Sequence, residues 1–360
     1  MHFWFIREQQ TAQGGSPRIR EIDMAKAIGV ICMLIGHRTV GPIHDYVYLF
    51  HMPLFFILSG CTMKEEKLSV GQILRRENKL LSSYIVFSVI VIVQQFCLEP
   101  NRNVLVQNIV DTFSFFGIGA LWFLSSLWIA KTVTRLILNK APGNLGLLTV
   151  FVIYEVCYSL SLILVRRTYN GVGMMAVRSL SWSLVRAGVV LVFVYAGYRL
   201  KNYILAFLTY CRQHLLVAVL IGLASAPAII PFITFETVDY HLLKNGLYLL
   251  DILYGALGTL SVLCLSSVLA QGCSAITAFL TFIGKNSLYF MVSEFFNLIG
   301  PMSYLLKTYM GIRNRYIVYG VYFVLLSLLI RIIKPIPEWM INRLTALLNS
   351  TVRQRQNSEK

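Results

Sequence analysis

The stretch REIDMAKAIGVICMLIGHRTV, residues 20–40, has a middle that is apolar enough to enter a lipid bilayer, yet its ionisable side chains include Asp23, Lys26 and His37. On a helix that turns about 100° per residue, Lys26 and His37 point within about 20° of each other. Asp23 points about 60° from Lys26 and about 40° from His37. The three side chains therefore share one stripe, which must face the interior of a helix bundle or a water-filled cleft rather than lipid.

Along this helix Lys26 and His37 are separated by roughly 16 Å, because each residue adds about 1.5 Å. They cannot act on one atom if the helix is straight, so a ligand that meets both must be long. The alternative interpretation is structural: Lys26 reaches the membrane surface beside Asp23, and His37 is hydrogen-bonded in the core. Helix geometry alone does not separate these two interpretations.

The composition of the whole chain indicates a membrane protein. Of its 360 residues, 57% are hydrophobic and only 13% are charged, whereas a soluble chain is about one quarter charged. Apolar runs of roughly 18 to 25 residues recur throughout, which is the length that crosses a bilayer. We therefore expect an all-α integral membrane protein with about ten transmembrane helices in one bundle. The expected spans are 24–40, 46–63, 80–98, 119–139, 145–165, 183–200, 213–235, 246–270, 279–300 and 316–334.

Three regions follow from this pattern: a disordered cytoplasmic tail at 1–18, a transmembrane domain at 19–334, and an amphipathic cytoplasmic tail at 335–360 that lies on the membrane surface. We expect the protein to lie in the cell membrane. The distribution of Lys and Arg predicts that both termini are in the cytoplasm. The formal charge of +16 is accounted for by this topology and by anionic lipid headgroups, so no nucleic acid is expected as a partner.

The cysteines and histidines give no sign of a metal site. The seven cysteines are scattered without a CxxC pair, so we interpret them as small core residues. His37, His44 and His51 recur every seven residues, but Gly41 and Pro42 interrupt the helix between the first two. We therefore interpret that spacing as coincidence and expect no metal.

Four further ionisable residues fall within the expected spans, where a charge in lipid would cost several kcal/mol. Arg186 and Asp251 lie near predicted helix ends, from which they can reach water. Glu155 lies in the middle of a span and is a candidate substrate-binding residue. Glu294 follows the polar segment GKNS at 284–287, which we call the late turn.

A second stretch, YLFHMPLFFILSGCTMK at 48–64, begins a helix with His51 just ahead of Pro53, where a helix can start. Ser59 and Gly60 form a small polar notch within it. Together with IDMAKAIGVICMLIGH at 22–37, this stretch closely resembles the start of the membrane acyltransferase-3 family, and within it the fucose 4-O-acetylase-like branch. The family's hallmark is a basic residue, ten residues and a histidine, which Lys26 and His37 match.

Three later stretches resemble the same branch in the same order. They are GALWFLSSLW at 119–128, VYAGYRLK at 194–201 and FIGKNSLYF at 282–290. Where the branch often has a histidine a few residues after the last of these, the chain has Ser293 and Glu294. The segment 140–270 carries little of the motif pattern, so we expect the choice of acceptor to be encoded there.

The resemblance implies a membrane O-acyltransferase with no bound cofactor. It would move acetyl from acetyl-CoA to a sugar hydroxyl of a carbohydrate or glycolipid acceptor. His37 would take the proton of the acceptor hydroxyl or carry the acetyl group transiently. Lys26 would bind a CoA phosphate, or hold a developing oxyanion if the first helix bends. Asp23 would orient Lys26.

The remaining implied contacts come from other segments. His51 and Ser59, on the second helix, would contact the substrate. Trp122 would offer a flat face to a sugar ring, or it is an aromatic residue of the membrane interface. Asn286 would bring a hydrogen-bond donor from the late turn. We therefore expect His37 to line a polar cavity shared with the second helix, closed by the late turn and open towards Lys26.

A transporter or flippase for a glycan or lipid intermediate is the alternative, because many helices with buried charges fit it equally well. Against it, no pair of broken helices stands in matching positions of two halves. The motifs also cluster in the first third of the chain, as a single site would. A membrane scaffold without chemistry would leave the stripe of Lys26 and His37 unexplained.

Overall fold

A computed structural model describes residues 19–165, 172–232, 238–244, 249–293, 299–311 and 314–358. These residues are almost entirely helical, and the only β pairing among them is one antiparallel bridge between Asp239 and Lys244. The helices in chain order are α1 (Arg20–Arg38), α2 (Pro42–Cys61), α3 (Val70–Leu98), α4 (Arg102–Phe113), η1 (Gly119–Leu121), α5 (Trp122–Lys140), α6 (Asn144–Leu164), α7 (Val172–Arg199), α8 (Lys201–Gln213), α9 (Leu215–Ser225), η2 (Pro227–Phe232), α10 (Leu249–Leu269), α11 (Ser274–Lys285), α12 (Ser287–Ser293), α13 (Ile299–Met310), α14 (Arg315–Ile333) and α15 (Pro335–Ser358).

The prediction of an all-α membrane protein is confirmed. Within the described ranges, five helices are long and apolar enough to cross a membrane: α3, α5 with η1, α6, α7 and α10. Three bent helix pairs pass the same test only together, so length and composition support up to eight spans. α1 and α2 are not among the five. Both carry polar or charged side chains and bury most of their residues inside the bundle, which is where a membrane protein places polar helices.

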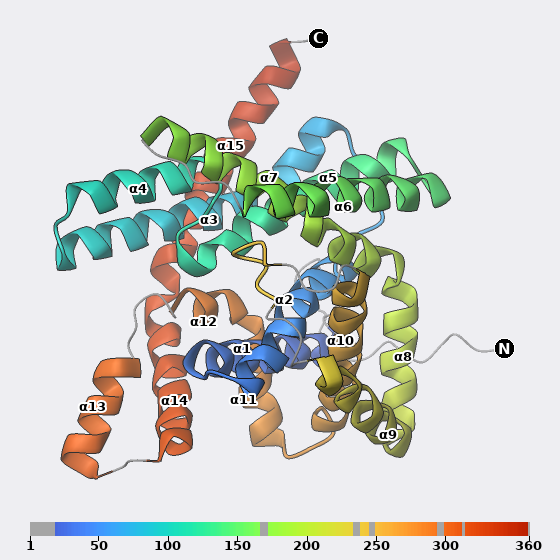
Figure 1. The fold of residues 1–360 in the computed structure, drawn as a ribbon, viewed down its shortest axis with the longest axis vertical. Coiled ribbons are helices and arrows are strands. Elements are labelled where there is room, and N and C mark those ends of the chain that lie inside the picture. The colour runs from blue at the N-terminus through green and yellow to red at the C-terminus, as the bar shows by residue number, and fades with distance from the viewer. Residues whose placement is uncertain are drawn as a thin grey trace.

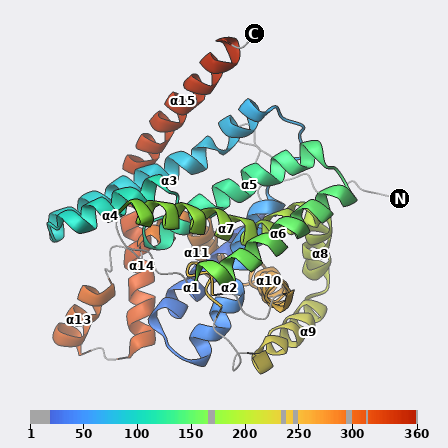
Figure 2. The same ribbon diagram turned by 45° about the horizontal axis from the view of Figure 1, so that its top comes forward.

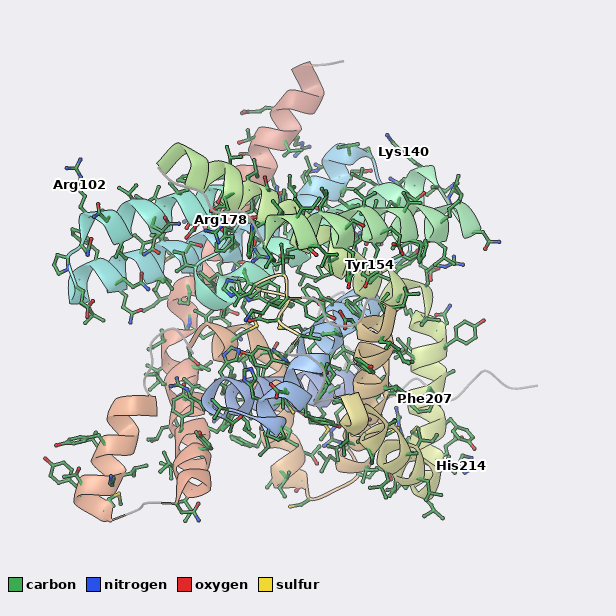
Figure 3. All side chains as sticks on the ribbon, in the orientation of Figure 1. Arg102, Lys140, Tyr154, Arg178, Phe207 and His214 are labelled. Carbon is green, nitrogen blue, oxygen red and sulfur yellow. The ribbon has the colours of Figure 1, made fainter. Side chains whose placement is uncertain are left out.

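The helices form two layers (Figure 1). The upper layer in that view contains α3 to α7, and the lower layer contains α1, α2 and α8 to α14. The labelled Arg102 and Lys140 mark opposite ends of the upper layer (Figure 3). The two layers are joined where α2 packs on α7. From the second viewpoint α15 projects beyond the body of the molecule (Figure 2).

The lower layer is built around an antiparallel hairpin of α1 and α2. The connection is short, and Gly41 in it has a φ of +80°, which favours glycine. Small residues allow the two helices to approach closely: a Cβ on Gly36 would lie 3.0 Å from Val47, and one on Gly29 would lie 2.9 Å from Leu54. This register places the His37 end of α1 beside the N-terminal end of α2, and the Lys26 end of α1 beside the C-terminal end of α2.

A second close approach joins the layers. A Cβ on Gly60 of α2 would overlap the carbonyl oxygen of Val194, and one on Gly197 of α7 would overlap that of Ile57. In lipid, helix association depends on such small residues, because lipid tails give no hydrophobic drive. The Ser59–Gly60 notch and the GY segment of α7 therefore act as a helix-crossing site.

Several expected boundaries were wrong. Pro42, not Pro53, occupies the first turn of α2, and Pro53 lies inside the helix. The expected span 213–235 forms the helix α9 only to Ser225, after a 119° bend from α8. The expected span 279–300 is broken at Asn286, where α11 and α12 meet at 72°. Residues 294–298 of this span, including Glu294, lie outside the described residues, and its last two residues begin α13.

The sequence predicted a disordered tail at 1–18 and an amphipathic tail at 335–360. Residues 1–18, expected as a disordered tail, lie outside the described residues. In the region 335–360, α15 packs along α3: Thr345 donates to the Ser82 hydroxyl at 2.9 Å, and Asn78 donates to Asn349 at 2.9 Å.

Candidate functional site

A cavity of about 380 Å³ lies between the two layers. The lower layer supplies the end of α1, the first half of α2 and one residue of α12, and the upper layer supplies η1 and the start of α5. The short turn 238–244 forms the remaining wall. The lining residues are Met33, His37, Tyr48, His51, Met52, Gly119, Ala120, Trp122, Phe123, Val238, Asp239, Tyr240, His241 and Met291.

His37 stands in the last turn of α1 and is exposed to this cavity. Its ring centroid lies 5.8 Å from that of Tyr48 and 6.3 Å from that of His51, which it meets edge-on. The close contact of Gly36 with α2 brings these rings together. His37 stands at the end of a buried helix and lines the cavity, so a substrate that entered the cavity would meet its ring.

His51 is only 2% exposed, and one hydrogen bond fixes its protonation pattern. Its Nδ1 lies 2.8 Å from the carbonyl oxygen of Val47, one turn back on α2. A carbonyl only accepts, so Nδ1 carries the proton and the neutral ring keeps its lone pair on Nε2. His51 is therefore held as a hydrogen-bond acceptor beside His37.

The seven-residue spacing of His37, His44 and His51 has a structural basis that the sequence did not reveal. Gly41 and Pro42 do interrupt the helix, but the hairpin folds α2 back on α1. His44 then stacks on Tyr48 at 3.9 Å, and its Nδ1 lies 2.9 Å from the carbonyl oxygen of Gly36. Among the described residues no group of three or more His, Cys, Asp or Glu side chains could hold a metal ion.

A third imidazole, that of His241, enters the cavity from the turn 238–244. The Asp239 carboxylate accepts from the backbone N–H of His241 at 2.9 Å and of Leu242 at 3.3 Å. The Asp239–Lys244 bridge closes the turn. Burial lowers the pKa of His241 to about 4, and the positive charge of Arg186 acts in the same direction. His241 is therefore neutral at physiological pH.

Trp122 reaches the cavity, as expected, but its ring already has partners. The His241 ring stacks on it at 5.7 Å, with 16° between the planes, and the Arg186 guanidinium lies 4.9 Å from its centroid. Only 7% of Trp122 is exposed. The indole therefore presents little free face to a sugar, and it supports His241 instead.

The expectation that Arg186 and Asp251 reach water was wrong. Arg186 is completely buried in the middle of α7, because this helix begins at Val172, eleven residues before the expected span. Its guanidinium donates to the Phe116 carbonyl at 2.6 Å, to the Ser126 hydroxyl at 3.0 Å and to the His241 carbonyl at 3.4 Å. Asp251 is 3% exposed on α10.

Lys26, Asp23 and Ser59 lie at the other end of the α1–α2 hairpin and do not line the cavity. Asp23 is buried, and Lys26 and Ser59 are half-buried. A Cβ on Gly284 would overlap the Asp23 carbonyl oxygen, so α11 crosses α1 at this end. The late turn therefore meets the Lys26 end of the helix rather than the His37 end.

Asn286 and Glu155 also lie outside the cavity. Asn286 forms the bend between α11 and α12, and its side-chain nitrogen donates to the Phe282 carbonyl at 2.8 Å. The bend does contribute to the cavity, but through Met291 of α12. Glu155 is half-buried on α6. Of the expected site residues, the structure brings His37, His51 and Trp122 together.

Sequence reasoning missed four residues in or around this site. Tyr48 sits within a quoted motif, and its spacing of four from His44 and three from His51 places all three on one face of α2. The spacing of Asp239 and His241 is that of an Asx turn. Nothing in the sequence links that turn to α1. Arg186 was noticed only as an intramembrane charge.

The apolar helices and the cavity between the two layers describe an integral membrane protein with a histidine-lined cavity. The family model described as an acyltransferase domain matches residues 19–332, which is most of the chain. The chain belongs to the acyltransferase-3 family. No curated protein and no solved structure gives a significant match.

Proposed function

We propose that this protein is an O-acetyltransferase that moves the acetyl group of acetyl-CoA to a sugar hydroxyl of a cell-surface or secreted glycan. The observation that carries the proposal is the position of His37, which faces a cavity and lies beside a second imidazole of defined tautomer. Membership of the acyltransferase family supports the class of reaction. The identities of the donor and of the acceptor are part of this proposal.

In the proposed reaction, the acceptor oxygen attacks the thioester carbonyl carbon while His37 takes the hydroxyl proton. The C–O bond forms, the C–S bond breaks, and the proton passes from His37 to the departing thiolate, so CoA leaves as its thiol. A neutral imidazole suits both transfers, because a ring nitrogen can accept a proton and later return it. His51 would hold the reacting groups through its Nε2 lone pair.

Lys26 would bind a phosphate of CoA at the other end of α1. The roughly 16 Å between Lys26 and His37 along the helix would then be covered by the extended arm of the donor. α1 is crossed closely by α11 at Asp23 and by α2 at Gly29, so the backbone that carries Lys26 would be fixed in place.

Mass spectrometry of glycans from cells with and without the protein tests the reaction. Loss of the protein should remove about 42 mass units, one acetyl group, from each modified sugar. Under the transporter alternative the amount of surface glycan would fall, while the mass of each remaining sugar would stay the same.

His37→Gln tests the role of His37, because glutamine keeps the polarity and approximate size but cannot act as a base. We expect a normally inserted protein whose transfer rate falls by at least about 100-fold. His214→Gln is the matched control, since His214 is exposed at the bend between α8 and α9 (Figure 3). Transfer by His37→Gln at nearly the wild-type rate would contradict the assignment.

A further inference from the structure

The turn 238–244 differs from the other walls of the cavity because it belongs to none of the helices. It connects the α9–η2 segment to α10, and it lies outside the five sequence stretches that resemble the family's motifs. It nevertheless places Asp239, Tyr240 and His241 on the cavity surface. A wall of this kind can vary without disturbing the helix bundle, as specificity-determining loops do.

The His241 side chain is held in one orientation from several sides. Its ring stacks on Trp122, its backbone N–H is bound by the Asp239 carboxylate, and its carbonyl accepts from the buried Arg186. The ring also lies 5.8 Å from the Phe116 ring, at a tilt. Pre-organisation of this kind is typical of a group that binds a ligand, because little entropy is lost on binding.

The Nε2 atom of His241 is buried and has no hydrogen-bond partner among the described residues. Buried polar atoms in proteins are nearly always satisfied, so an exception calls for an explanation. A neutral imidazole donates through one nitrogen and accepts through the other. A hydroxyl group, which also donates and accepts, is a chemically matched partner.

We propose that His241 binds a second hydroxyl of the acceptor, next to the one that is acylated at His37, so that the cavity selects a polyol over a simple alcohol. This inference rests on the proposed function and deepens it. His37 performs the proton transfer, and His241 orients the acceptor without taking part in bond making. The turn 238–244 is then the acceptor-recognition element of the protein.

The test uses the full-length protein in membranes and in cells, with His241→Ala and His241→Gln. One readout is the release of CoA thiol from acetyl-CoA, with water as the acceptor. The other is the acetyl content of cell glycans, measured by mass spectrometry. We expect both variants to keep CoA release within about twofold of wild type. We expect glycan acetylation to fall about tenfold in the alanine variant, the effect of one lost hydrogen bond.

A purified preparation sharpens the test with named acceptors, a panel of methyl hexopyranosides and the monohydroxy alcohol cyclohexanol. The alanine variant should raise the KM for any accepted hexopyranoside and leave transfer to cyclohexanol unchanged. His241→Gln, which retains a donor and an acceptor, should restore part of the affinity. His214→Ala is the matched control and should change neither readout.

Three outcomes would overturn the inference. Glycan acetylation by His241→Ala at the wild-type level would show that His241 does not bind the acceptor. Equal loss of CoA release and of glycan acetylation would place His241 with the donor or the chemistry instead. Equal loss for hexopyranoside and cyclohexanol would exclude polyol selection. If wild-type protein neither releases CoA nor acetylates glycans, the proposed function itself fails, which is a distinguishable result.

Discussion

Substitution of Lys26 should distinguish binding of the donor from binding of the acceptor. It lies on α1 away from the cavity and about eleven residues from His37. If Lys26 binds a donor phosphate as proposed, Lys26→Ala should raise the KM for acetyl-CoA and leave the KM for the acceptor unchanged. Lys26→Arg should retain part of the activity, since a guanidinium also binds phosphate. Steady-state kinetics with each substrate varied in turn would measure both effects.

A change confined to the acceptor KM in Lys26→Ala would show that Lys26 does not bind the donor. Lys64, which is exposed after α2, provides the matched control. Its replacement by alanine should leave both KM values near those of the wild-type protein.

Arg186 is the second residue for which the structure predicts a clear effect of substitution, here on the stability of the fold. It binds the Phe116 and His241 carbonyls and the Ser126 hydroxyl, and it packs on Trp122. Arg186→Met should lower the free energy of unfolding by at least about 2 kcal/mol, because buried carbonyl groups would be left without donors. Thermal unfolding in detergent measures this loss.

Arg186→Lys separates charge from geometry. A lysine keeps the positive charge but cannot form the planar set of contacts, so we expect it to behave more like methionine than like wild type. The control is Arg178→Met, two turns earlier on α7, where the exposed guanidinium lies 5.1 Å from the Trp182 ring. Its cost should be less than about 1 kcal/mol. Equal stability of the Arg178 and Arg186 variants would contradict this role.

At the scale of the helices, the crossing of α2 and α7 holds the two layers together. Gly60→Ala or Gly197→Ala would place a methyl group on a carbonyl oxygen of the facing helix. We expect each to destabilise the protein by about 1–3 kcal/mol or more, because packed backbones must separate to admit it. Both should also lower activity, since the cavity lies between the layers.

Gly320 in α14 is the matched control for this crossing. A Cβ on it meets nothing within 4 Å, so Gly320→Ala should be neutral or stabilising by up to about 1 kcal/mol. Thermal unfolding of all three variants, measured in one detergent, makes the comparison. Stability of Gly60→Ala equal to that of Gly320→Ala would show that the crossing tolerates separation.

The way in which the helices are connected explains which parts of the site the sequence could predict. The pairing of His37 with His51 was predictable, because a short connection forces α1 and α2 into an antiparallel hairpin. The polar GKNS segment at 284–287 marked a turn near Asn286, but the 72° angle between α11 and α12 was not predictable, because tertiary packing imposes it. The start of α2 was misplaced because both Pro42 and Pro53 are plausible first-turn residues, and only packing decides between them.

For the molecule as a whole, the limit of sequence reasoning is the distance between partners along the chain. Trp122, Arg186 and His241 come from three separate segments, and no local pattern indicates that they meet. The class of protein was predictable from composition, because membrane insertion is a property of individual segments. The far wall of the cavity was not predictable, because it depends on how the two layers assemble.

The layered arrangement has a consequence for how the protein is made. The hairpin of α1 and α2 is synthesised first, but Gly284, whose lack of a side chain lets α11 seat on Asp23, follows 261 residues later. At about 5–20 residues per second, the polar stripe waits roughly 10–50 s on the ribosome before this cover exists. During that time the upper layer, residues 70–199, must emerge and insert. The polar stripe of α1 is thus enclosed long after it is made, and it needs protection by the insertion machinery while the intervening helices are synthesised.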